Sequence, residues 1–414
     1  YLGKIAETRF DFSVAADYYK NCVKLNPQEK DTWLWLGMCQ LKLKNIDDAT
    51  IALETAEKIN PNSTEVQTGL GMALMEKRKY ALARDRFLKA TKFSKYNYLA
   101  ILLSAICDVK LENYNSAEIT LNFLSKVAPN EGSMYEYANL KFLKEDYKSS
   151  EELALKSLNF NKKMLPSYLI LADIYSIQKN LDKTENILKS AIENDLDGEI
   201  LQFAWGKALL RFFYFESAKI HFEKSLEFNP ELIDSKLAIA LLMSYNKDFS
   251  LLNSLKERYP SKSMVQEAVG LELYNSNKFE NAIEYFKKAL NNDKFQTYNF
   301  LNIARCYKSA QNKDKTIEYY EKFIQANPQY IEGIIEYSKW LFEIQDYANA
   351  QRKLRKAEKL DENNCEILNM LFYSSYILVK DKLCEYNIKE TIGIANKISP
   401  LENFRYEKEK QELE

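Results

Sequence analysis

Histidine is almost absent from this sequence, which limits the catalytic and metal sites that the chain can build. His221 is the single histidine among 414 residues, so a zinc site or a histidine-based acid–base pair would need unusual partners. The phosphate-binding loop G-x4-G-K-[ST], the dinucleotide-binding turn G-x-G-x-x-G and the nucleophile elbow G-x-S-x-G do not occur either. We therefore expect a chain without catalytic activity, metal or cofactor, in which His221 is a surface or packing residue.

Cysteine pairs with the spacing of metal ligands are also missing. The six cysteines are Cys22, Cys39, Cys107, Cys306, Cys365 and Cys384, and none belongs to a C-x2-C pair. Cys39 and Cys107 would lie two repeats apart in the array described below, beyond the roughly 7 Å Cα separation that a disulfide allows. Cys39, Cys107 and Cys306 share one repeat position and are then small apolar packing residues. The absence of disulfide or metal-ligand spacing leads us to expect a cytoplasmic protein. An extracytoplasmic or periplasmic location is the alternative if a leader is missing from this segment.

An excess of charge of either sign is absent, as is any long apolar run. Lysine and arginine number 58 against 59 aspartates and glutamates, for a net charge of -1. Nucleic-acid binding and electrostatic membrane binding both favour a basic surface, so we expect neither partner. The longest apolar stretch, 98–109, contains Ser104 and Asp108 and is too short to span a bilayer. Because the chain begins with Tyr1 rather than methionine, we expect it to be a segment of a longer protein.

Glycine and proline are scarce, with 10 and 8 residues, and the prolines mark a period. A proline cannot continue the helix that precedes it, so it marks a helix end. Pro61 and Pro129 are separated by twice the interval from Pro27 to Pro61, and so are Pro260 and Pro328. This spacing predicts helical units about 34 residues long.

One such unit is seen in residues 33–61. Apolar residues recur there at i, i+3, i+4 and i+7 in two stretches, which predicts two amphipathic helices joined by a turn. The first helix contains Trp33, Leu36 and Gly37, and the second contains Ala49, Leu53 and Ala56. A hairpin of this size cannot bury its own apolar faces, so it must stack on copies of itself.

Small and large residues recur at fixed positions along the whole chain. One position of the first helix holds Gly3, Gly37, Gly71, Ala105, Ala138, Ala172, Gly206, Ala240, Gly270, Ala304, Ser338 and Phe372. The second helix has a small position at Ala15, Ala49, Ala83, Ala117, Ser150, Thr184, Ala218, Ala282, Thr316 and Ala350, and a large residue four positions later. Together with the motif W-x2-L-G-x2-Y, A-x3-F, A and P, this pattern resembles the tetratricopeptide repeat. The resemblance implies an all-α, right-handed superhelical solenoid of about twelve helix-turn-helix repeats with a C-terminal capping helix.

The expected domain organisation is one solenoid followed by a cap. We expect the solenoid to cover 1–400 and the charged segment 401–414 to form the capping helix. The last repeat, 365–400, is atypical, because Phe372 stands at a small position and four extra residues fall near 381–386.

Two repeats depart from the period inside the array. The interval from Pro230 to Pro260 is shorter than the period, so the repeat at 233–260 lacks four residues, which we place around 245–249. The three repeats before Pro230 are together one residue short, and we place that deletion near 138–150. The shorter repeat is expected to bend the solenoid or change its twist.

The resemblance also implies a concave surface lined by the first helices. In the second to fourth repeats its positions hold Leu34, Met38, Leu41, Met72, Met75, Leu99, Leu102, Ile106 and Val109. Large apolar patches tend to mark interaction sites, and methionine adapts its shape to a partner. This surface predicts binding of an amphipathic helix or an extended apolar segment. The alternative is that several of these residues belong to the core.

Later repeats place aromatic and basic residues at the same positions. These are Phe142, Phe203, Lys207, Arg211, Tyr274, Arg305, Lys308, Lys339 and Phe342. Such a composition suits acidic or aromatic peptide segments, with a solvated inner face as the alternative. The family's lysine and asparagine clamp for the acidic tails of heat-shock chaperones is absent.

These observations predict a non-catalytic scaffold or adaptor that binds partner polypeptides along its concave face within a larger assembly. One alternative is the substrate-recognition arm of an enzyme whose catalytic domain lies outside this segment. Another is a homo-oligomerisation module in which the apolar surface of the second to fourth repeats is buried in a homodimer.

Overall fold

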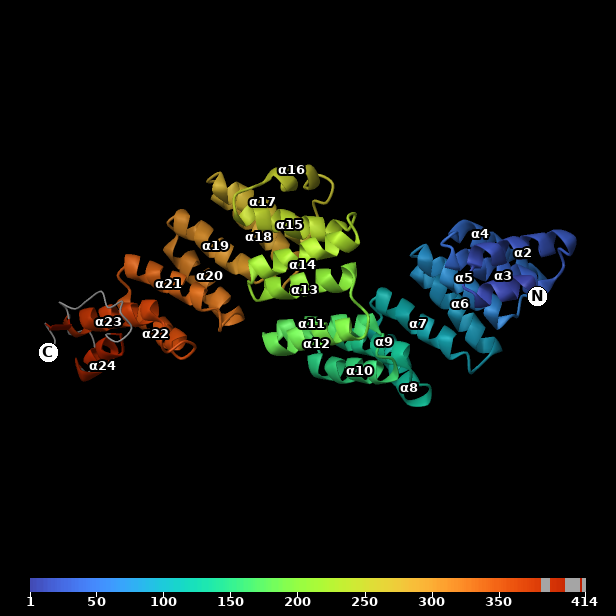
Figure 1. The fold of residues 1–414 in the computed structure, drawn as a ribbon, viewed down its shortest axis with the longest axis horizontal. Coiled ribbons are helices and arrows are strands. Elements are labelled where there is room, and N and C mark those ends of the chain that lie inside the picture. The colour runs from blue at the N-terminus through green and yellow to red at the C-terminus, as the bar shows by residue number, and fades with distance from the viewer. Residues whose placement is uncertain (381–387, 399–409, 412–414) are drawn as a thin grey trace. The chain divides into compact units, whose positions relative to one another are not determined.

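The chain is helical throughout the part that the structure describes. The structure is a computed structural model that describes residues 1–380, 388–398 and 410–411 (Figure 1). These residues form twenty-four α-helices and no β-strand, which confirms the all-α class. The extra residues near 381–386 and nearly all of the expected capping helix at 401–414 lie outside the described residues. Residues 1–208 and 209–414 form two compact units, described separately below.

The first unit contains six complete hairpins and most of a further helix. Its helices are α1 (Leu2–Thr8), α2 (Phe12–Leu25), α3 (Lys30–Lys42), α4 (Ile46–Ile59), α5 (Thr64–Glu76), α6 (Tyr80–Phe93), α7 (Tyr98–Lys110), α8 (Tyr114–Val127), α9 (Glu131–Leu143), α10 (Tyr147–Phe160), α11 (Leu165–Ile177), α12 (Leu181–Glu193) and α13 (Glu199–Arg211), which crosses the boundary. We number the hairpins from the N-terminus, so that α1 and α2 form hairpin one. First helices of neighbouring hairpins also touch, as α3 does with α5 and α7 with α9.

The second unit continues the same pattern. Its helices are α14 (Phe215–Phe228), α15 (Ile233–Tyr245), α16 (Ser250–Leu255), α17 (Ser263–Asn275), α18 (Phe279–Asn292), α19 (Tyr298–Ser309), α20 (Lys313–Ala326), α21 (Ile331–Glu343), α22 (Tyr347–Glu358), α23 (Cys365–Lys380) and α24 (Ile388–Ile398). Here too the first helices touch, α15 with α17 and α17 with α19.

The small position of the first helix faces the large position of the second helix. A Cβ atom built on Gly37 would lie 2.6 Å from Cγ of Leu53, and one on Gly71 would lie 2.5 Å from Cε1 of Phe87. Leu53 and Phe87 are fully buried. The two helices of a hairpin can therefore close on each other only because these positions carry no side chain. The recurring small and large positions of the sequence thus meet inside the hairpin.

Gly37→Leu is expected to lower the free energy of unfolding by about 1–3 kcal/mol, because the added side chain overlaps Leu53 in a filled core. Thermal unfolding followed by circular dichroism measures the change. Gly198→Ala is the control, since a Cβ there meets no atom within 4 Å. A Gly37→Leu melting curve that coincides with that of the control would contradict the assignment of the small position.

A second repeating position lies in the turn inside each of the first eleven hairpins. In these turns, non-glycine residues with positive φ stand at Phe10, Lys44, Arg78, Glu112, Glu145, Lys179, Phe213, Lys247, Asn277, Gln311 and Gln345. In the turn after α3, the Lys44 N–H donates to the Leu41 carbonyl (3.1 Å) and the Asn45 N–H to the Gln40 carbonyl (2.9 Å). This is the Schellman arrangement, in which a left-handed residue turns the chain back onto the last carbonyls of the helix.

The spacing of these turn residues corrects the position of both deletions. Glu145 follows Glu112 one position earlier than the period requires, and α8 and α9 are joined by 128–130 alone, whereas α6 and α7 are joined by the longer connection 94–97. The missing residue is therefore in the connection at 128–130 and not near 138–150, because the spacing of prolines gives the number of residues lost but not their place.

The larger deletion falls after the turn of its hairpin rather than in it. Lys247 follows Phe213 by one full period, so the chain up to that turn is complete. The following helix, α16, has 6 residues, whereas the second helices on either side, α14 and α18, have 14. The four missing residues therefore fall in 250–262, which contains α16 and its connection to α17, and not in 245–249.

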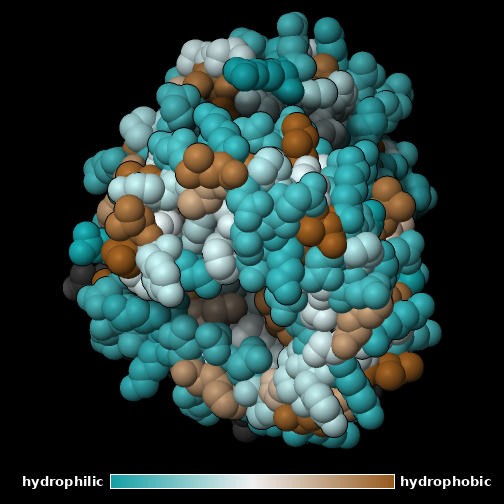
Figure 2. Space-filling view, turned by 90° about the vertical axis from the view of Figure 1, so that its right-hand side faces the viewer, coloured by the Kyte–Doolittle hydropathy of each residue, from teal (hydrophilic) through white to brown (hydrophobic). Residues whose placement is uncertain are grey.

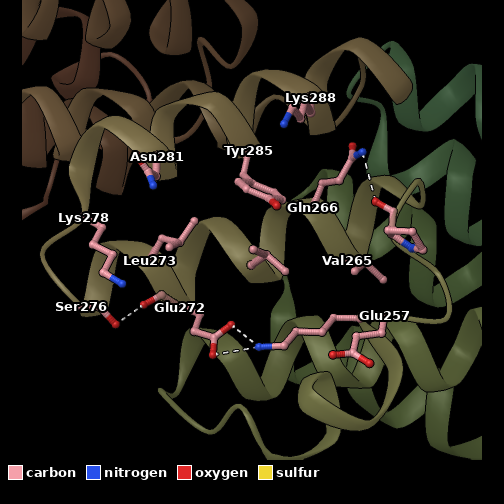
Figure 3. Close-up of a pocket in the computed structure, with 13 residues that line it drawn as sticks. Glu257, Val265, Gln266, Glu272, Leu273, Ser276, Lys278, Asn281, Tyr285 and Lys288 are labelled. Carbon is pink, nitrogen blue, oxygen red and sulfur yellow. Dashed lines mark hydrogen bonds and ion pairs between the residues drawn. The ribbon is translucent and has the colours of Figure 1, made fainter.

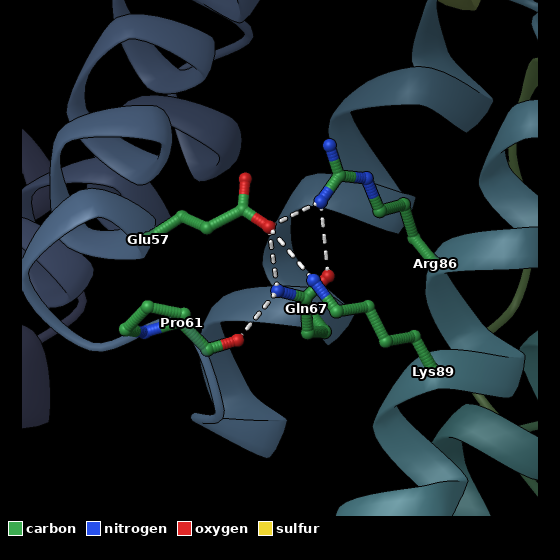
Figure 4. A network of polar contacts seen from close by, with 5 residues as sticks. All are labelled: Glu57, Pro61, Gln67, Arg86 and Lys89. Carbon is green, nitrogen blue, oxygen red and sulfur yellow. Dashed lines mark hydrogen bonds and ion pairs between the residues drawn. The ribbon is translucent and has the colours of Figure 1, made fainter.

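Polar side chains join successive hairpins. Glu57 on α4 accepts hydrogen bonds from Gln67 on α5 (2.8 Å) and from Lys89 on α6 (3.1 Å), and it also accepts one from Arg86 (Figure 4). Burial opposes ionisation of Glu57, but the hydrogen bonds from Gln67, Lys89 and Arg86 outweigh it and lower the pKa of this carboxyl. Pro61 anchors the same cluster, because its carbonyl accepts from the Gln67 amide at 3.2 Å. Hairpins two and three are thus joined by polar contacts among α4, α5 and α6.

In the second unit, the turn between α13 and α14 packs against helices far along the chain. The ring centroid of Phe213 lies 5.0 Å from that of Tyr298, 5.9 Å from Phe323 and 4.6 Å from Tyr330. Phe215 lies 5.1 Å from Tyr245. These rings join the turn of hairpin seven to hairpins ten and eleven. The local pattern of repeats does not predict this contact.

A buried carboxyl lies between hairpins eight, nine and ten. Glu267 on α17 is 3% exposed and accepts hydrogen bonds from the Tyr245 hydroxyl and from Asn299 Nδ2, the latter at 2.9 Å. Asn302 Nδ2 donates to the Tyr245 hydroxyl at 3.2 Å. Burial raises the pKa of Glu267 to about 7, although the bonds from Tyr245 and Asn299 act in the opposite direction, and nearby Asp293 adds to the rise.

The surface of the described residues is mixed in polarity, and three of the thiols are buried. Figure 2 shows separate hydrophobic patches among hydrophilic side chains at the end of the molecule that it faces. Within the described ranges, no helix is both long and apolar enough to cross a bilayer, and no cluster of three or more His, Cys, Asp or Glu could hold a metal ion. Cys39, Cys107 and Cys306 are buried free thiols, which confirms their predicted packing role.

Candidate functional site

The first helices of hairpins two, three and four line a groove in the first unit. Its apolar side chains are Leu34 and Met38 on α3, Met72 on α5 and Leu99 on α7. The remaining lining residues are Trp35, Thr64, Glu65, Thr68, Ser94 and Asn97, and the cavity measures about 490 Å³. Leu99 is 54% exposed, and Leu34, Met38 and Met72 are half-buried. The groove therefore combines a partly exposed apolar surface with a few polar groups.

A glycine on α5 determines how Met38 lies in the groove. A Cβ atom on Gly69 would lie 2.9 Å from Cδ2 of Leu53 and 3.2 Å from Sδ of Met38. The bare backbone at Gly69 therefore lets α5 approach hairpin two, and Met38 lies against it. Because the thioether chain is unbranched and flexible, Met38 can adjust to different ligand shapes.

The polar groups of the groove bond to one another and fix its shape. Asn97 caps α7 by accepting from the Ala100 N–H at 3.0 Å, and its amide nitrogen donates to Oγ1 of Thr68 at 3.2 Å. The Thr68 hydroxyl in turn donates to the Thr64 carbonyl at 2.8 Å. These bonds join the start of α7 to α5, so the groove floor spans two hairpins as one hydrogen-bonded surface.

Trp35 forms one side of the groove, and its ring also contacts residues of hairpin one. Its ring centroid lies 5.6 Å from that of Tyr19 on α2, and the ammonium of Lys4 on α1 lies 4.0 Å from the same ring. The indole of Trp33, in contrast, donates to the Pro27 carbonyl at 2.8 Å. Trp35 is thus held by hairpin one while it lines the groove.

The structure brings together only part of the predicted apolar set. Leu34, Met38, Met72 and Leu99 line the groove, whereas Met75, Leu102 and Ile106 are half-buried outside it. Leu41 and Val109 are 7% and 6% exposed and belong to the cores of hairpins two and four. Their prediction as surface residues is wrong, because both stand in the last turn of their helix, where the side chains pack against the second helix and the next hairpin.

Sequence reasoning missed six lining residues of the groove, Trp35, Thr64, Glu65, Thr68, Ser94 and Asn97. Trp35 was outside the positions expected to face inward. Asn97 stands in a connection between hairpins, and its signal is that of a helix-capping asparagine three residues before Ala100. This signal predicts the cap but does not show that the amide reaches Thr68 on the neighbouring first helix.

The basic residues predicted to face acidic peptides are paired within the chain. Arg305 on α19 binds Glu336 on α21 through two nitrogens, at 2.9 and 2.6 Å. The other pairs are Lys207 with Asp173 (3.4 Å), Lys308 with Glu343 (3.0 Å) and Lys339 with Glu366 (2.8 Å). Each pair joins neighbouring first helices, so these cations neutralise the chain's own carboxylates. They are not available as a row of unpaired positive charge.

The aromatic residues of that set are divided between the two units. Phe142 lies 5.6 Å from Tyr147 in the first unit, where Phe203 is half-buried. In the second unit Phe342 lies 5.4 Å from Tyr347. Arg211 is 7% exposed, with its guanidinium 5.3 Å from the Phe295 ring centroid, so its prediction as a surface residue is wrong. The Arg211 side chain is therefore too buried to contact a partner.

Tyr274 and Arg305 do share a cavity. It measures about 280 Å³ and is also lined by Tyr245, Phe249 and Phe279, among others. Since Arg305 is already bound to Glu336 and the cavity is the smaller one, the groove of α3, α5 and α7 is the stronger candidate site.

Comparisons with known proteins agree with the repeat architecture. Models of the tetratricopeptide repeat match residues 9–73, 267–295 and 298–330. The anaphase-promoting complex subunit 3 of Schizosaccharomyces pombe is 28% identical over 177 residues, which are 42% of this chain and 24% of that protein. The antiviral innate immune response effector IFIT1 of Homo sapiens is 26% identical over 216 residues, which are 47% of this chain and 45% of that protein. The chain thus spans less than half the length of both relatives.

A solved structure shows the same fold over most of the chain. The crystal structure of the APC/C hetero-tetramer Cut9-Hcn1 superposes with a TM-score of 0.62 at 17% identity, covering 90% of this chain and 79% of that chain. At this level of identity the likeness concerns the fold alone.

Proposed function

Because this chain is a tetratricopeptide repeat protein, we propose that it is a non-catalytic scaffold that holds a segment of a partner polypeptide in the groove of α3, α5 and α7. The observation that carries the proposal is the convergence of Leu34, Met38, Met72 and Leu99, from three hairpins, on one cavity. A partner that lies along the groove contacts all three hairpins at once. It can therefore be recognised over a length that no single repeat provides.

The chemistry of the groove favours an apolar segment, either an amphipathic helix or an extended strand of chain. Four apolar side chains and one tryptophan supply the buried area, and each apolar side chain that a partner buries contributes about 1.5–3 kcal/mol before ordering costs. Thr68, Asn97 and Glu65 stand among them and can receive backbone or side-chain polar groups of the partner. Methionines at two of the positions allow partners of different shape.

A place in a larger assembly is part of the proposal. One relative is named as a subunit of the anaphase-promoting complex, and the solved structure with the same fold is a hetero-tetramer of that complex. These names support an assembly role for this chain, although they concern other proteins that share only part of it or its fold. The groove provides the contact through which such a role would be exerted.

Met38→Glu combined with Met72→Glu is expected to abolish partner capture while helix content and melting temperature stay unchanged. A partner would have to bury two unpaired carboxylates, which costs several kcal/mol, or about a hundredfold or more in affinity. Affinity capture from the native source, with identification of the bound proteins, measures the loss. Light scattering of the unaltered chain shows separately whether the groove is instead buried in a homodimer.

The matched control carries the same charges on the second helices. Ile51 on α4 and Ile119 on α8 are 62% and 74% exposed, so Ile51→Glu with Ile119→Glu should leave capture intact. If the methionine pair retains the same partners as the control pair, the groove is not the binding site.

A further inference from the structure

A second pocket lies beside the short helix α16 in the second unit. The cavity measures about 710 Å³ and is lined by residues that follow α16 and by α17 and α18 (Figure 3). Its α17 residues include Val265, Val269 and Glu272, whereas Leu271 and Tyr274 line the smaller cavity beside Arg305. The two cavities therefore use different faces of α17. Where a 14-residue second helix would cover α17, the 6-residue α16 leaves it accessible.

We propose that this pocket binds a segment of a partner polypeptide in which an acidic side chain stands next to an apolar one. The proposal concerns a surface separate from the groove of α3, α5 and α7 and does not depend on it. The apolar floor of the pocket, the charge at its rim and its open edges support this binding.

The floor of the pocket is apolar and well supported. Val265 is 3% exposed, and Val269, Leu273 and Tyr285 are half-buried around it. Gln266 is held in place, because its amide nitrogen donates to the Pro260 carbonyl at 3.3 Å and its oxygen accepts from Asn292 at 2.8 Å. A ligand therefore meets a fixed apolar surface suited to an aliphatic or aromatic side chain.

The rim supplies unpaired positive charge. Lys256 is neutralised by Glu272 through contacts of 3.1 and 2.9 Å. Lys278 and Lys288 are exposed and have no carboxylate partner among the described residues, and the Lys288 ammonium lies 4.6 Å from the Tyr285 ring centroid. Figure 3 places Glu257 on the opposite side of the pocket from Lys278. A carboxylate beside Lys278 or Lys288 is thus attracted, and one beside Glu257 is not.

The open edges favour a polypeptide over a small compact ligand. Pro260, Ser276 and Asn281 are exposed where three different segments reach the pocket. A chain that places one apolar side chain on Val265 and Val269 can leave the pocket in either direction. Asn281 and Ser276 offer side-chain hydrogen bonds to its backbone.

A peptide array probed with the full chain tests the proposal. The array carries heptapeptides with Asp or Glu beside Leu, Ile or Phe, and matched peptides with Asn or Gln in place of the acid. We expect the acidic peptides to bind more tightly, with an affinity that falls as salt is added, because the contacts are charge-assisted and partly exposed. Absence of binding, or equal binding of the amide peptides, would overturn the proposal.

Variants of the full chain then locate the binding. For the best acidic peptide, labelled with fluorescein, Lys278→Glu with Lys288→Glu should raise the dissociation constant about tenfold or more. Lys287→Glu with Lys313→Glu, which reverses the same charge at exposed residues outside the pocket, should change it little. If the peptide loses affinity only in the Met38→Glu/Met72→Glu variant, it binds the groove, and the pocket assignment fails without affecting the proposed function.

Discussion

Phe213→Ala is expected to lower the free energy of unfolding of the second unit by about 3–5 kcal/mol, the cost of removing a buried phenylalanine ring. The ring is 9% exposed and packs against Tyr298, Phe323 and Tyr330, which lie on hairpins ten and eleven and their connection. Its loss leaves a cavity at the turn of hairpin seven that packs against these rings. The repeats themselves remain, because each still rests on its neighbours.

Urea unfolding of the full chain measures the destabilisation, and hydrogen–deuterium exchange locates it. Amide exchange should accelerate in α19, α20 and α21, and much less in α3 to α6. Tyr214→Ala is the control, because Tyr214 is adjacent in sequence and 50% exposed. A Phe213→Ala variant no less stable than Tyr214→Ala would show that the ring contacts do not support the second unit.

Glu267→Gln is expected to stabilise the chain in a manner that depends on pH. Burial raises the pKa of Glu267 to about 7 from its ordinary value of 4.5. Below pH 4.5 the carboxyl is protonated in both the folded and the unfolded state, and it has no effect on the pH dependence. Between pH 4.5 and about pH 7 the unfolded chain releases the proton and the folded chain keeps it, so the free energy of unfolding falls as pH rises.

The loss is complete above pH 7, where the folded chain also ionises. A glutamine has nearly the same shape: its oxygen can accept from Asn299, and its amide nitrogen can donate to the Tyr245 hydroxyl oxygen. It never becomes charged. The stability difference between variant and unaltered chain should therefore grow by about 2–3 kcal/mol from pH 4.5 to pH 8. Parallel urea titrations at these pH values measure it. A difference that does not change with pH would mean that Glu267 titrates normally.

The sequence predicts the hairpins well because their determinants are local. Gly37 and Leu53 stand less than half a period apart in one hairpin, and the fit of a bare backbone against a large side chain recurs in every copy. Periodic small residues therefore predict both helices and how they meet. The same local pattern does not separate surface from core. Helical spacing places Leu41 and Met38 on related faces but does not show that Leu41 is covered by α4 and α5.

Contacts between hairpins are less accessible to sequence reasoning. Arg305 and Glu336 are both visible in the sequence, yet many acids lie about one repeat away, and the pairing depends on how neighbouring helices are turned. The position of a deletion is equally hard to predict. The spacing of the prolines gives the number of residues lost, but it does not show that the loss shortens α16. The Phe213 contacts and the pocket beside α16 both arise from packing over several repeats, which no local pattern encodes.

The central claim is that the groove of α3, α5 and α7 holds a partner polypeptide. The most direct test is the affinity of the captured partner's binding segment, measured by fluorescence anisotropy, for the unaltered chain and for the two double variants. The account predicts that Met38→Glu/Met72→Glu weakens binding about a hundredfold or more, while Ile51→Glu/Ile119→Glu binds as the unaltered chain does. Equal affinity for all three proteins would contradict it.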